Sequence, residues 1–483
     1  MIRRAGVAGV AALVLPLGVA LAQTPPSSDA ELRQEVEEQK QRLLILERKL
    51  ELQEEAAKEA TKSAPVVKAS NGRFSFGTPD GANVVKLRGT LHFDYRRYTD
   101  DITPETADTF IFRRIRPTLE GTIASIYDFR FMPDFAGGKT IIVDSYVAAR
   151  FRPWSVVTAG KFKVPIGLER IQSASDIRFI ERGFPTSLVP NRDLGIQLGG
   201  DVKGGVLNYS VGYFNGVNDG GSSDGNTANG AAAADIENDT HGDWAARVFF
   251  QPFLNSDSFA LRGLGFGVAG TFVDTTGSPT TTLLTSYRTP GQQSFFNWRT
   301  SAVATPTTPA TTTGTYADGK RTRISPQFYY YLGQFGLLGE YVDVSQEVTR
   351  VNGPVTRSDE IGIKAWQLQA SWFLTREEET FKGFTPGSTF EPGKGGIGAW
   401  ELVARVHQLK IGDEAFAGGG DSFANPSTAA RKASAWGVGV NWYLNQSVKL
   451  SLNYDQTRFD GGAADGGDRP DEKAVFSRIG LAF

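Results

Sequence analysis

The residues of this 483-residue chain best suited to chemistry are the cations between positions 150 and 192. The stretch holds eight basic side chains and three carboxylates, in a chain whose formal net charge is only −2. The basic residues are Arg150, Arg152, Lys161, Lys163, Arg170, Arg178, Arg182 and Arg192. Cationic groups gathered in a confined passage attract anions and stabilise them as they lose water. The local excess of positive charge therefore predicts a site that binds or conducts anions.

The sequence predicts that β-strands position these cations. From about residue 84 to residue 483, apolar side chains recur at every second position in runs of about 9 to 16 residues, separated by polar breaks. We count sixteen such runs, an even number. They lie near 84–98, 109–124, 125–136, 140–152, 155–166, 193–203, 205–216, 243–253, 260–274, 322–333, 334–349, 361–376, 398–411, 433–445, 446–460 and 473–483.

The two faces of these runs favour a membrane barrel over a soluble sandwich. In the run 446–460, Val448, Leu450 and Leu452 share one face, whereas Lys449, Ser451 and Asn453 share the other. A closed barrel pairs every backbone group in hydrocarbon, which an open sheet cannot do at its edges. Tyr329, Tyr330 and Tyr331 fall where an interfacial aromatic girdle would lie, and the chain ends on Phe483 after an alternating strand. The sequence predicts an all-β membrane protein, a 16-stranded antiparallel transmembrane barrel.

The breaks between strands differ in length and character. Long breaks at 217–242 and 275–321 are interleaved with tight ones at 332–334 and 444–446, as expected of loops on one side of a membrane and turns on the other. The break 167–192 is long but rich in apolar residues, so we expect it to fold against the inner wall and narrow the lumen. We predict that this inward-folded third loop forms a constriction.

Alternation also indicates which cations face the lumen. Arg114 and Arg116 share a face with Thr118 and Glu120, while Lys86, Arg88 and Arg96 lie opposite Leu87, Leu91 and Phe93. Two interpretations follow. Either the arginines give the channel a preference for anions, or they pair with carboxylates such as Asp94, Glu120, Asp144, Glu169 and Glu181 and leave a general, weakly selective pore for small hydrophilic solutes.

The N-terminal region carries two further signals. Residues 1–22 have the arginines, apolar stretch and Ala20-Leu21-Ala22 motif of a cleaved secretory signal. Within 23–63, Leu32, Val36, Gln39, Leu43, Leu46, Leu50, Gln53, Ala57 and Ala60 recur every three or four residues. This seam predicts a short periplasmic coiled coil, with a single solvated helix as the alternative. We expect a linker over 64–80 and the barrel over 81–483.

Signals for other functions are weak. The chain has no cysteine, and His92, His241 and His407 lack a second ligand at metal spacing. The glycine pattern at 265–270 lies inside a strand with no following helix, so it does not indicate a dinucleotide site. Asp/Gly-rich loops at 218–226 and 460–468 are candidate calcium sites, His241 beside Asp243 is the one candidate for a barrel hydrolase, and an adhesin built on the coiled coil would have a closed lumen. We expect no enzyme activity and no cofactor.

The sequence resembles the phosphate-selective porin O/P family of Gram-negative outer membranes. The similarity spans about 80–483 and is most specific in RGTLHFDYRRY (88–98), FRRIRPTLEG (112–121), GKFKVPIGLER (160–170), FIERGFP (179–185) and GVNWYLNQSVKLSLNYDQTRF (439–459). The resemblance implies a homotrimer of barrels in outer-membrane lipid, conducting small phosphate-like anions along a ladder of basic residues, with no role for nucleic acid. It places Arg170 where members that hold phosphate tightly have lysine.

Residue and resemblance arguments together give one set of expected selectivity residues. Arg113 and Arg114 match the Phe-Arg-Arg pair of the family, and Asp144 matches its acidic partner in the fourth strand. The expected set is Arg88, Arg113, Arg114, Arg116, Arg130, Asp144, Lys161, Lys163, Arg170, Arg178 and Arg182.

Overall fold

A computed structural model describes residues 29–70, 73–99, 108–138, 140–223, 241–299 and 313–483. The chain divides into two units, Met1–Ala64 and Pro65–Phe483. The signal sequence expected over 1–22 lies outside the described residues. Among the described residues, no helix combines the length and the apolar character that crossing a membrane requires.

The first unit contains one long helix, α1 (Asp29–Ser63). Asp29 and Glu31 lie in its first turn, where carboxylates favour a helix start. Arg48 pairs with Glu51 at 2.9 Å along the solvated surface. The apolar seam residues are exposed, from 49% at Leu32 to 59% at Leu46. Their exposure in a single chain leaves the seam available to partner helices, and the coiled coil stays a prediction.

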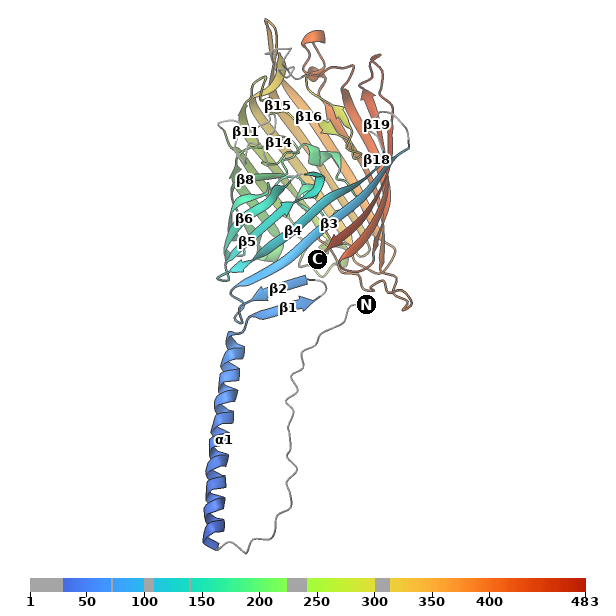
Figure 1. The fold of residues 1–483 in the computed structure, drawn as a ribbon. Coiled ribbons are helices and arrows are strands. Elements are labelled where there is room, and N and C mark those ends of the chain that lie inside the picture. The colour runs from blue at the N-terminus through green and yellow to red at the C-terminus, as the bar shows by residue number, and fades with distance from the viewer. Residues whose placement is uncertain (1–28, 71–72, 100–107, 139, 224–240, 300–312) are drawn as a thin grey trace. The chain divides into compact units, whose positions relative to one another are not determined.

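The second unit is a closed antiparallel barrel of sixteen strands, counted within the described residues (Figure 1). Each strand pairs with the next, and β20 pairs with β3 to close the ring. The strands are β3 (Val84–Tyr98), β4 (Thr109–Ile123), β5 (Tyr127–Asp134), β6 (Ile141–Arg152), β7 (Ser155–Lys163), β8 (Arg192–Val202), β9 (Leu207–Phe214), β10 (Asp243–Phe250), β11 (Leu264–Thr276), β14 (Gly314–Leu332), β15 (Phe335–Asn352), β16 (Val355–Phe373), β17 (Ala399–Ile411), β18 (Ala430–Tyr443), β19 (Val448–Gly461) and β20 (Glu472–Ala482). All sixteen overlap the runs counted from the sequence.

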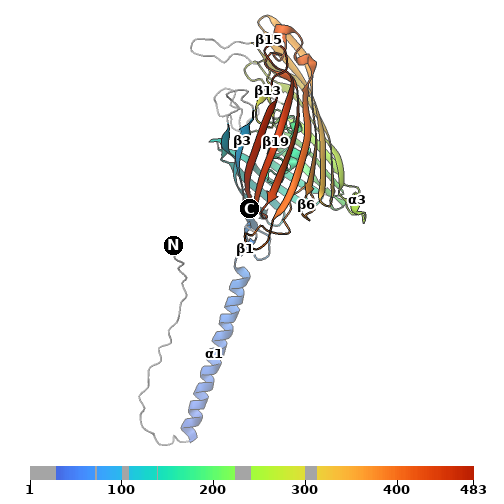
Figure 2. The same ribbon diagram turned by 90° about the vertical axis from the view of Figure 1, so that its right-hand side faces the viewer.

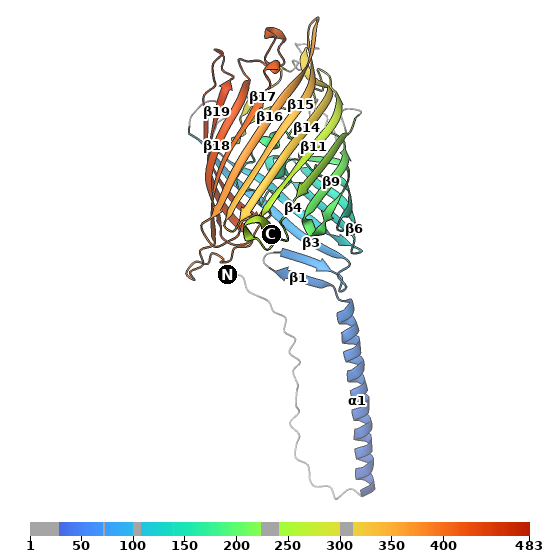
Figure 3. The ribbon, with the colours of Figure 1, turned by 180° about the vertical axis from the view of Figure 1, so that it is seen from behind.

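Alternation along the strands sorts side chains between an apolar outside and a polar inside. On β17, Leu402 and Val406 are exposed by 41% and 44%, whereas Glu401 and Arg405 are buried. On β19, Leu452 is exposed whereas Asn453 and Asp455 are buried. This is the reverse of a soluble protein and is typical of a barrel whose outer surface meets lipid. Figures 1 and 3 show the slanting strands of the two sides of this wall.

The three consecutive tyrosines do not form one girdle. Tyr329 is only 8% exposed and packs inside the barrel against Phe249 and Phe381, with ring centroids 4.9 and 5.3 Å apart. Tyr331 contacts Tyr329 on the same face at 5.0 Å. The expectation that all three lie at the membrane interface is therefore wrong, because neighbours in a strand face opposite sides.

The expected linker over 64–80 contains two strands. β1 (Val66–Ser70) and β2 (Arg73–Gly77) form a hairpin, and β2 pairs with the first residues of β3 from Val84 to Leu87. β20 pairs with the remainder of β3, from Thr90 to Tyr98. The hairpin therefore continues the sheet beyond the end of β20.

Most short turns lie at one end of the barrel and most long loops at the other. The end that carries the turns at 333–334 and 444–447 is called the short-turn end, and the other is the long-loop end. The β15–β16 turn, at the long-loop end, has only two residues (353–354). The two strands are 18 and 19 residues long, so their hairpin extends far at this end of the barrel (Figure 2). Conversely, the β16–β17 connection at the short-turn end runs from 374 to 398. Smaller elements in the connections are α2 (Leu168–Ile171), α3 (Phe259–Arg262), β12 (Tyr287–Arg288) and β13 (Ser294–Phe296).

Candidate functional site

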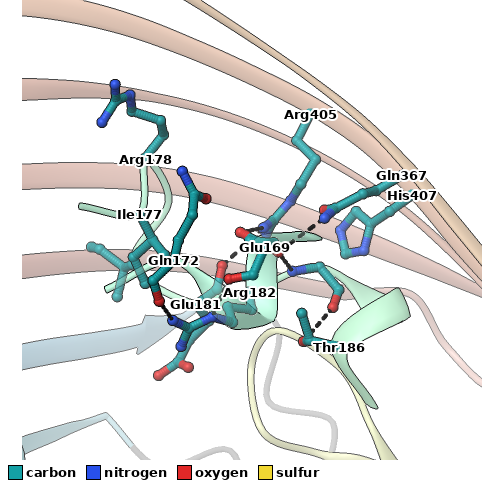
Figure 4. Close-up of polar contacts among 12 residues, drawn as sticks. Glu169, Gln172, Ile177, Arg178, Glu181, Arg182, Thr186, Gln367, Arg405 and His407 are labelled. Carbon is teal, nitrogen blue, oxygen red and sulfur yellow. Dashed lines mark hydrogen bonds and ion pairs between the residues drawn. The ribbon is translucent and has the colours of Figure 1, made fainter. Parts of the chain in front are cut away.

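The segment between β7 and β8, residues 164–191, makes its contacts with the far wall of the barrel. β7 is the fifth strand of the ring and β17 the thirteenth, so the two are diametrically opposed. The backbone N–H of Phe184 donates to His407 Nδ1 of β17 at 3.1 Å, and that of Ile180 donates to Asn453 of β19 at 2.8 Å. Arg405 of β17 donates to the carbonyl of Glu181 at 2.9 Å (Figure 4). We call residues 164–191 the β7–β8 segment.

Apolar contacts and buried carboxylates, Glu169 among them, hold the β7–β8 segment in place. Ile177, Phe179 and Leu188 are at most 1% exposed. Glu169 accepts a hydrogen bond from the backbone of Gly183 at 2.9 Å and another from Gln367 of β16 at 3.0 Å (Figure 4). The segment is thereby hydrogen-bonded both to itself and to β16.

Arg178 belongs to the framework of this arrangement. Its guanidinium pairs with Glu401 of β17 at 2.6 Å and with Glu379 of the β16–β17 connection at 2.7 Å. All three side chains are almost completely buried. Although Arg178 is in the expected set, its charge is matched by two carboxylates, so the geometry indicates a tie between two segments and not a source of surplus charge.

Glu181 links the segment to the strands that carry the arginines. It pairs with Arg96 of β3 at 2.8 Å and with Arg113 of β4 at 2.7 Å. Burial opposes ionisation of Glu181, but the adjacent Arg113 and Arg96 hold its pKa well below the usual value. Glu181 is therefore a carboxylate that fixes the segment against β3 and β4.

A bulge explains how both Arg113 and Arg114 reach the lumen. Opposite them, His92 pairs with Arg114 and Phe93 with Phe112, so Arg113 is an extra residue in the register of β4. The bulge shifts the alternation by one position. As a result Phe110 and Phe112 are exposed by 65% and 50%, whereas Arg114 on the same parity is 4% exposed.

Four of the expected selectivity cations donate hydrogen bonds to neutral acceptors and form no ion pair among the described residues. Arg114 donates to His92 Nδ1 at 3.1 Å, and Arg170 donates to the carbonyl of Thr186. Arg182 donates to the carbonyls of Glu169 and Gln172 at 3.1 and 2.9 Å. Lys163 donates to the carbonyls of Ile171 and Gln172 at 3.2 and 2.5 Å. We call Arg114, Lys163, Arg170 and Arg182 the uncompensated cations.

Arg170 has both like and opposite charges near it. Burial lowers its pKa and the guanidinium groups of Arg182 and Arg192 lower it further, whereas Glu169 and Glu340 act in the opposite direction. Among the described residues, no carboxylate lies within 4.0 Å of the cationic group of any uncompensated cation. Positive charge packed at this density favours the arrival of an anion.

The remaining expected residues carry paired charges. Arg116 pairs with Asp134 at 2.7 Å, and Arg192 pairs with Asp144 at 2.9 Å. Glu120 lies 3.3 Å from Arg88 and 2.7 Å from Arg130, which is also 3.7 Å from Asp144. Lys161 is 2% exposed on β7. Charge pairing of this kind is what the general-pore interpretation predicts.

Two cavities occupy the lumen on either side of the β7–β8 segment. The long-loop cavity has a volume of 550 Å³, and seven arginines and two carboxylates line it. The short-turn cavity has a volume of 890 Å³ and a more balanced lining. Both are lined by Arg116, Ala174 and Arg192. Three of the uncompensated cations (Arg114, Arg170 and Arg182) line the long-loop cavity, and Lys163 lines the short-turn cavity.

Sequence reasoning missed two members of this site. Arg405 and Arg478 are buried in ion pairs inside the barrel, the first with Asp455 at 3.5 Å and the second with Asp94 at 2.6 Å. Alternation would have placed Arg405 and Arg478 on the inner face. Their partners lie on other strands or on the β7–β8 segment, and no local pattern identifies those.

The alternative sites find no geometry to support them. His92, His241 and His407 are not gathered, and no group of three or more metal-ligating side chains occurs among the described residues. In the 218–226 loop, Asp219 pairs with Arg323 at 2.7 Å, while residues 224–226 lie outside the described residues. The glycines at 265–270 are part of β11, paired with β10 and β14.

Comparison with known proteins gives matches over most of the chain. The family model described as Phosphate-selective porin O and P matches residues 85–243 and 292–483. Porin O of Pseudomonas aeruginosa is 23% identical over 437 residues, covering 88% of this chain and 94% of the relative. OmpT, an outer membrane protein of Vibrio cholerae, aligns with a TM-score of 0.49 and 11% identity over 83% of this chain and 98% of its own. The anion-selective porin from Comamonas acidovorans aligns with a TM-score of 0.46 and 13% identity, over 83% and 100%.

Proposed function

Because the chain belongs to the phosphate-selective porin O and P family, we propose that it is a passive outer-membrane channel that admits small anions of the phosphate class. Membership of this family makes the protein a channel and not an enzyme. The observation that carries the proposed preference is the set of uncompensated cations around the junction of the two cavities. An anion arriving there adds negative charge beside cations that form no direct ion pair with a carboxylate of the described chain.

In this proposal the β7–β8 segment is the constriction. Its hydrogen bonds to β17 and β19 span the ring, and the two cavities meet beside it at Arg116 and Arg192. Surplus charge at a constriction acts on every passing ion, because the ion sheds water where the dielectric constant is low. Charge elsewhere in the lumen has less effect because water screens it.

A second candidate function is a general, weakly selective pore for small hydrophilic solutes. The paired charges of Arg88, Arg113, Arg116, Arg130 and Arg192 favour it. Planar-bilayer recordings under a salt gradient distinguish the two. An anion-selective reversal potential supports the proposed function, and a cation-selective or near-zero potential contradicts it.

The preferred anion is tested by titrating phosphate into a chloride solution. If phosphate occupies the cluster, it reduces the chloride current at concentrations well below that of chloride. The guanidinium of Arg170 binds through a planar fork, whereas the lysine expected from the family would present a compact point charge. Arginine in place of lysine at position 170 therefore affects the affinity for phosphate and leaves the sign of the charge selectivity unchanged.

We also propose the assembly and topology that the family resemblance implies. The barrel forms a homotrimer, residues 1–22 are removed as a secretory signal, and the exposed seam of α1 joins three helices in the periplasm. The support for the last point is the seam of Leu32, Val36, Leu43, Leu46 and Leu50, which is exposed in the single chain. Crosslinking of purified protein across this seam tests it.

A further inference from the structure

His92 lies beside the uncompensated cations and the proposed constriction does not account for it. It is 3% exposed on the inner face of β3, and its Nδ1 lies 3.1 Å from Nη1 of Arg114. On its other side it is paired with Gly480 of β20. A Cβ atom at position 480 would lie 3.6 Å from His92 Cδ2 and 3.8 Å from Nε2. The ring therefore stands between an arginine and a residue without a side chain.

The contact with Arg114 fixes where the imidazole proton is. A guanidinium has only donors, so the hydrogen bond runs from Arg114 to Nδ1, and Nδ1 carries no proton. An imidazole that accepts at Nδ1 is the neutral tautomer with its proton on Nε2. His92 therefore has an N–H donor at Nε2 and no charge.

The position of His92 makes that donor relevant to transport. Arg114 lines the long-loop cavity and His92 lines the short-turn cavity, while Arg116 lines both. The hydrogen-bonded pair thus bridges the two compartments at their junction. An anion moving from the long-loop cavity past Arg114 enters a cavity that His92 lines together with further cations such as Arg88 and Arg130.

His407 shows that a buried histidine in this lumen need not have such a role. Its Nδ1 also accepts, from the backbone N–H of Phe184 at 3.1 Å. Its Nε2 is buried and has no hydrogen-bond partner among the described residues, and His407 is absent from the lining of both cavities. His407 supports the β7–β8 segment, whereas His92 faces the passage.

We propose that Nε2–H of His92 is an uncharged ligand for an oxyanion when the oxyanion leaves the arginines that line the long-loop cavity. This inference rests on the proposed function and adds a specificity-determining residue to it. Hydrogen bonds from charged donors are about twice as strong as those from neutral ones. A neutral donor on the exit side holds an anion oxygen without trapping it, as conduction requires.

The test uses the full-length protein in planar bilayers and inorganic phosphate as the probe. His92→Leu removes both the donor and the acceptor, whereas His92→Gln retains one of each. Loss of one hydrogen bond corresponds to a change of roughly three- to tenfold in affinity. We expect His92→Leu to raise the phosphate concentration that halves the chloride current by about that factor, without changing the sign of the reversal potential. His92→Gln should stay near the wild type.

Thr90→Val is the matched control, because Thr90 lies on the same strand and lines the same cavity. It should leave the half-blocking concentration unchanged. If His92→Leu does not give folded barrels, His92→Phe replaces it, since the ring is retained without its nitrogens. An unchanged half-blocking concentration in a folded variant overturns the inference.

A double-mutant cycle with Arg114→Gln separates a ligand from a positioning residue. If His92 touches the anion, His92→Leu weakens phosphate block in the Arg114→Gln background as well. If His92 only orients Arg114, its effect disappears there, and the ligand assignment is wrong. Failure of the proposed function is recognised separately, as a wild-type channel that is cation-selective or insensitive to phosphate.

Discussion

Arg116 and Arg192 come from strands β4 and β8, and each lines both cavities of the lumen. Each is paired with its own carboxylate, Asp134 at 2.7 Å and Asp144 at 2.9 Å. The junction of the two cavities is therefore lined by arginines that are paired with carboxylates, and the unpaired positive charge comes from the uncompensated cations around it. We therefore expect substitutions of the uncompensated cations to change the charge selectivity more than substitutions of the paired arginines Arg116 and Arg192.

Reversing the charge of Arg170 and Arg182 should abolish or invert the preference for anions. Both donate to backbone carbonyls, so replacing them with glutamate removes no ion pair within the described chain. The measurement is the reversal potential of Arg170→Glu/Arg182→Glu under a salt gradient. Arg431→Glu/Lys432→Glu, at partly exposed positions at the start of β18, is the matched control. Equal potentials for the two double variants would remove Arg170 and Arg182 from the constriction.

Arg170→Lys should strengthen phosphate block while preserving anion selectivity. The ammonium of lysine is a compact point charge with three donors, whereas the guanidinium of Arg170 is committed in part to the carbonyl of Thr186. We expect the half-blocking phosphate concentration to fall and the reversal potential to stay the same. A higher half-blocking concentration would show that the planar fork is the better ligand at this position.

Glu181→Gln should destabilise the barrel and increase its preference for anions. The substitution leaves Arg96 and Arg113 without their shared carboxylate, and breaking a buried ion pair costs about 3–5 kcal/mol. Glu120→Gln makes the same change in charge at a more exposed pair and should cost at most about 1 kcal/mol. The readouts are the reversal potential and the temperature at which the folded gel band is lost. A smaller loss for Glu181→Gln than for Glu120→Gln would contradict this account.

The stabilisation due to Glu181 should persist on mild acidification. Its pKa is lowered in the folded protein, so the contribution is complete above the usual glutamate value of 4.5 and is lost only as the pH falls toward the folded pKa. We therefore expect the difference in unfolding temperature between wild type and Glu181→Gln to be the same at pH 7 and pH 5. A difference that shrinks between these values would mean that the pKa of Glu181 is not depressed.

Glu379→Gln should loosen the β7–β8 segment from the β16–β17 connection. Glu379 is buried against Arg178, and the peptide carbonyls of Thr380 and Phe381 accept from Arg178 and Gln172 at 2.9 and 2.8 Å. We expect noisier single-channel currents and a lower unfolding temperature. Glu378→Gln, at the neighbouring exposed position, changes the charge equally and should do neither. Identical records from the two variants would show that the tie does not restrain the segment.

Deleting residues 29–62 should leave conducting trimers. The helix α1 and the barrel are separate units, and the sixteen paired strands close without α1. Native gels and bilayer conductance of the truncated protein measure the outcome. Recovery of monomers alone would show that the coiled coil is required for assembly.

The sequence predicted the strands well because alternation is a local property. Leu452 and Asn453 are neighbours with opposite environments, and their types alone reveal which faces lipid. The same rule placed Arg114 and Arg116 in the lumen. Local pattern also indicated that the apolar β7–β8 segment would not extend into water.

What could not be predicted depends on register and on contacts across the ring. The bulge at Arg113 brings two consecutive arginines inward, and no residue type in the sequence predicts this bulge. Arg178 was expected to contribute surplus charge, but its partners Glu379 and Glu401 lie about two hundred residues away in sequence. His92 was considered only as a metal ligand, because its hydrogen bond to Arg114 depends on how β3 and β4 pair.

The carbonyl oxygens that hold Lys163, Arg170 and Arg182 have a consequence for the environments in which the channel works. A peptide carbonyl neither gains nor loses a proton over the ordinary pH range, so the hydrogen bonds that hold these side chains persist in both acidic and neutral media. Protonation of nearby carboxylates would increase the net positive charge of the lumen and strengthen its attraction for anions. Anion conductance is therefore expected to persist at acidic pH.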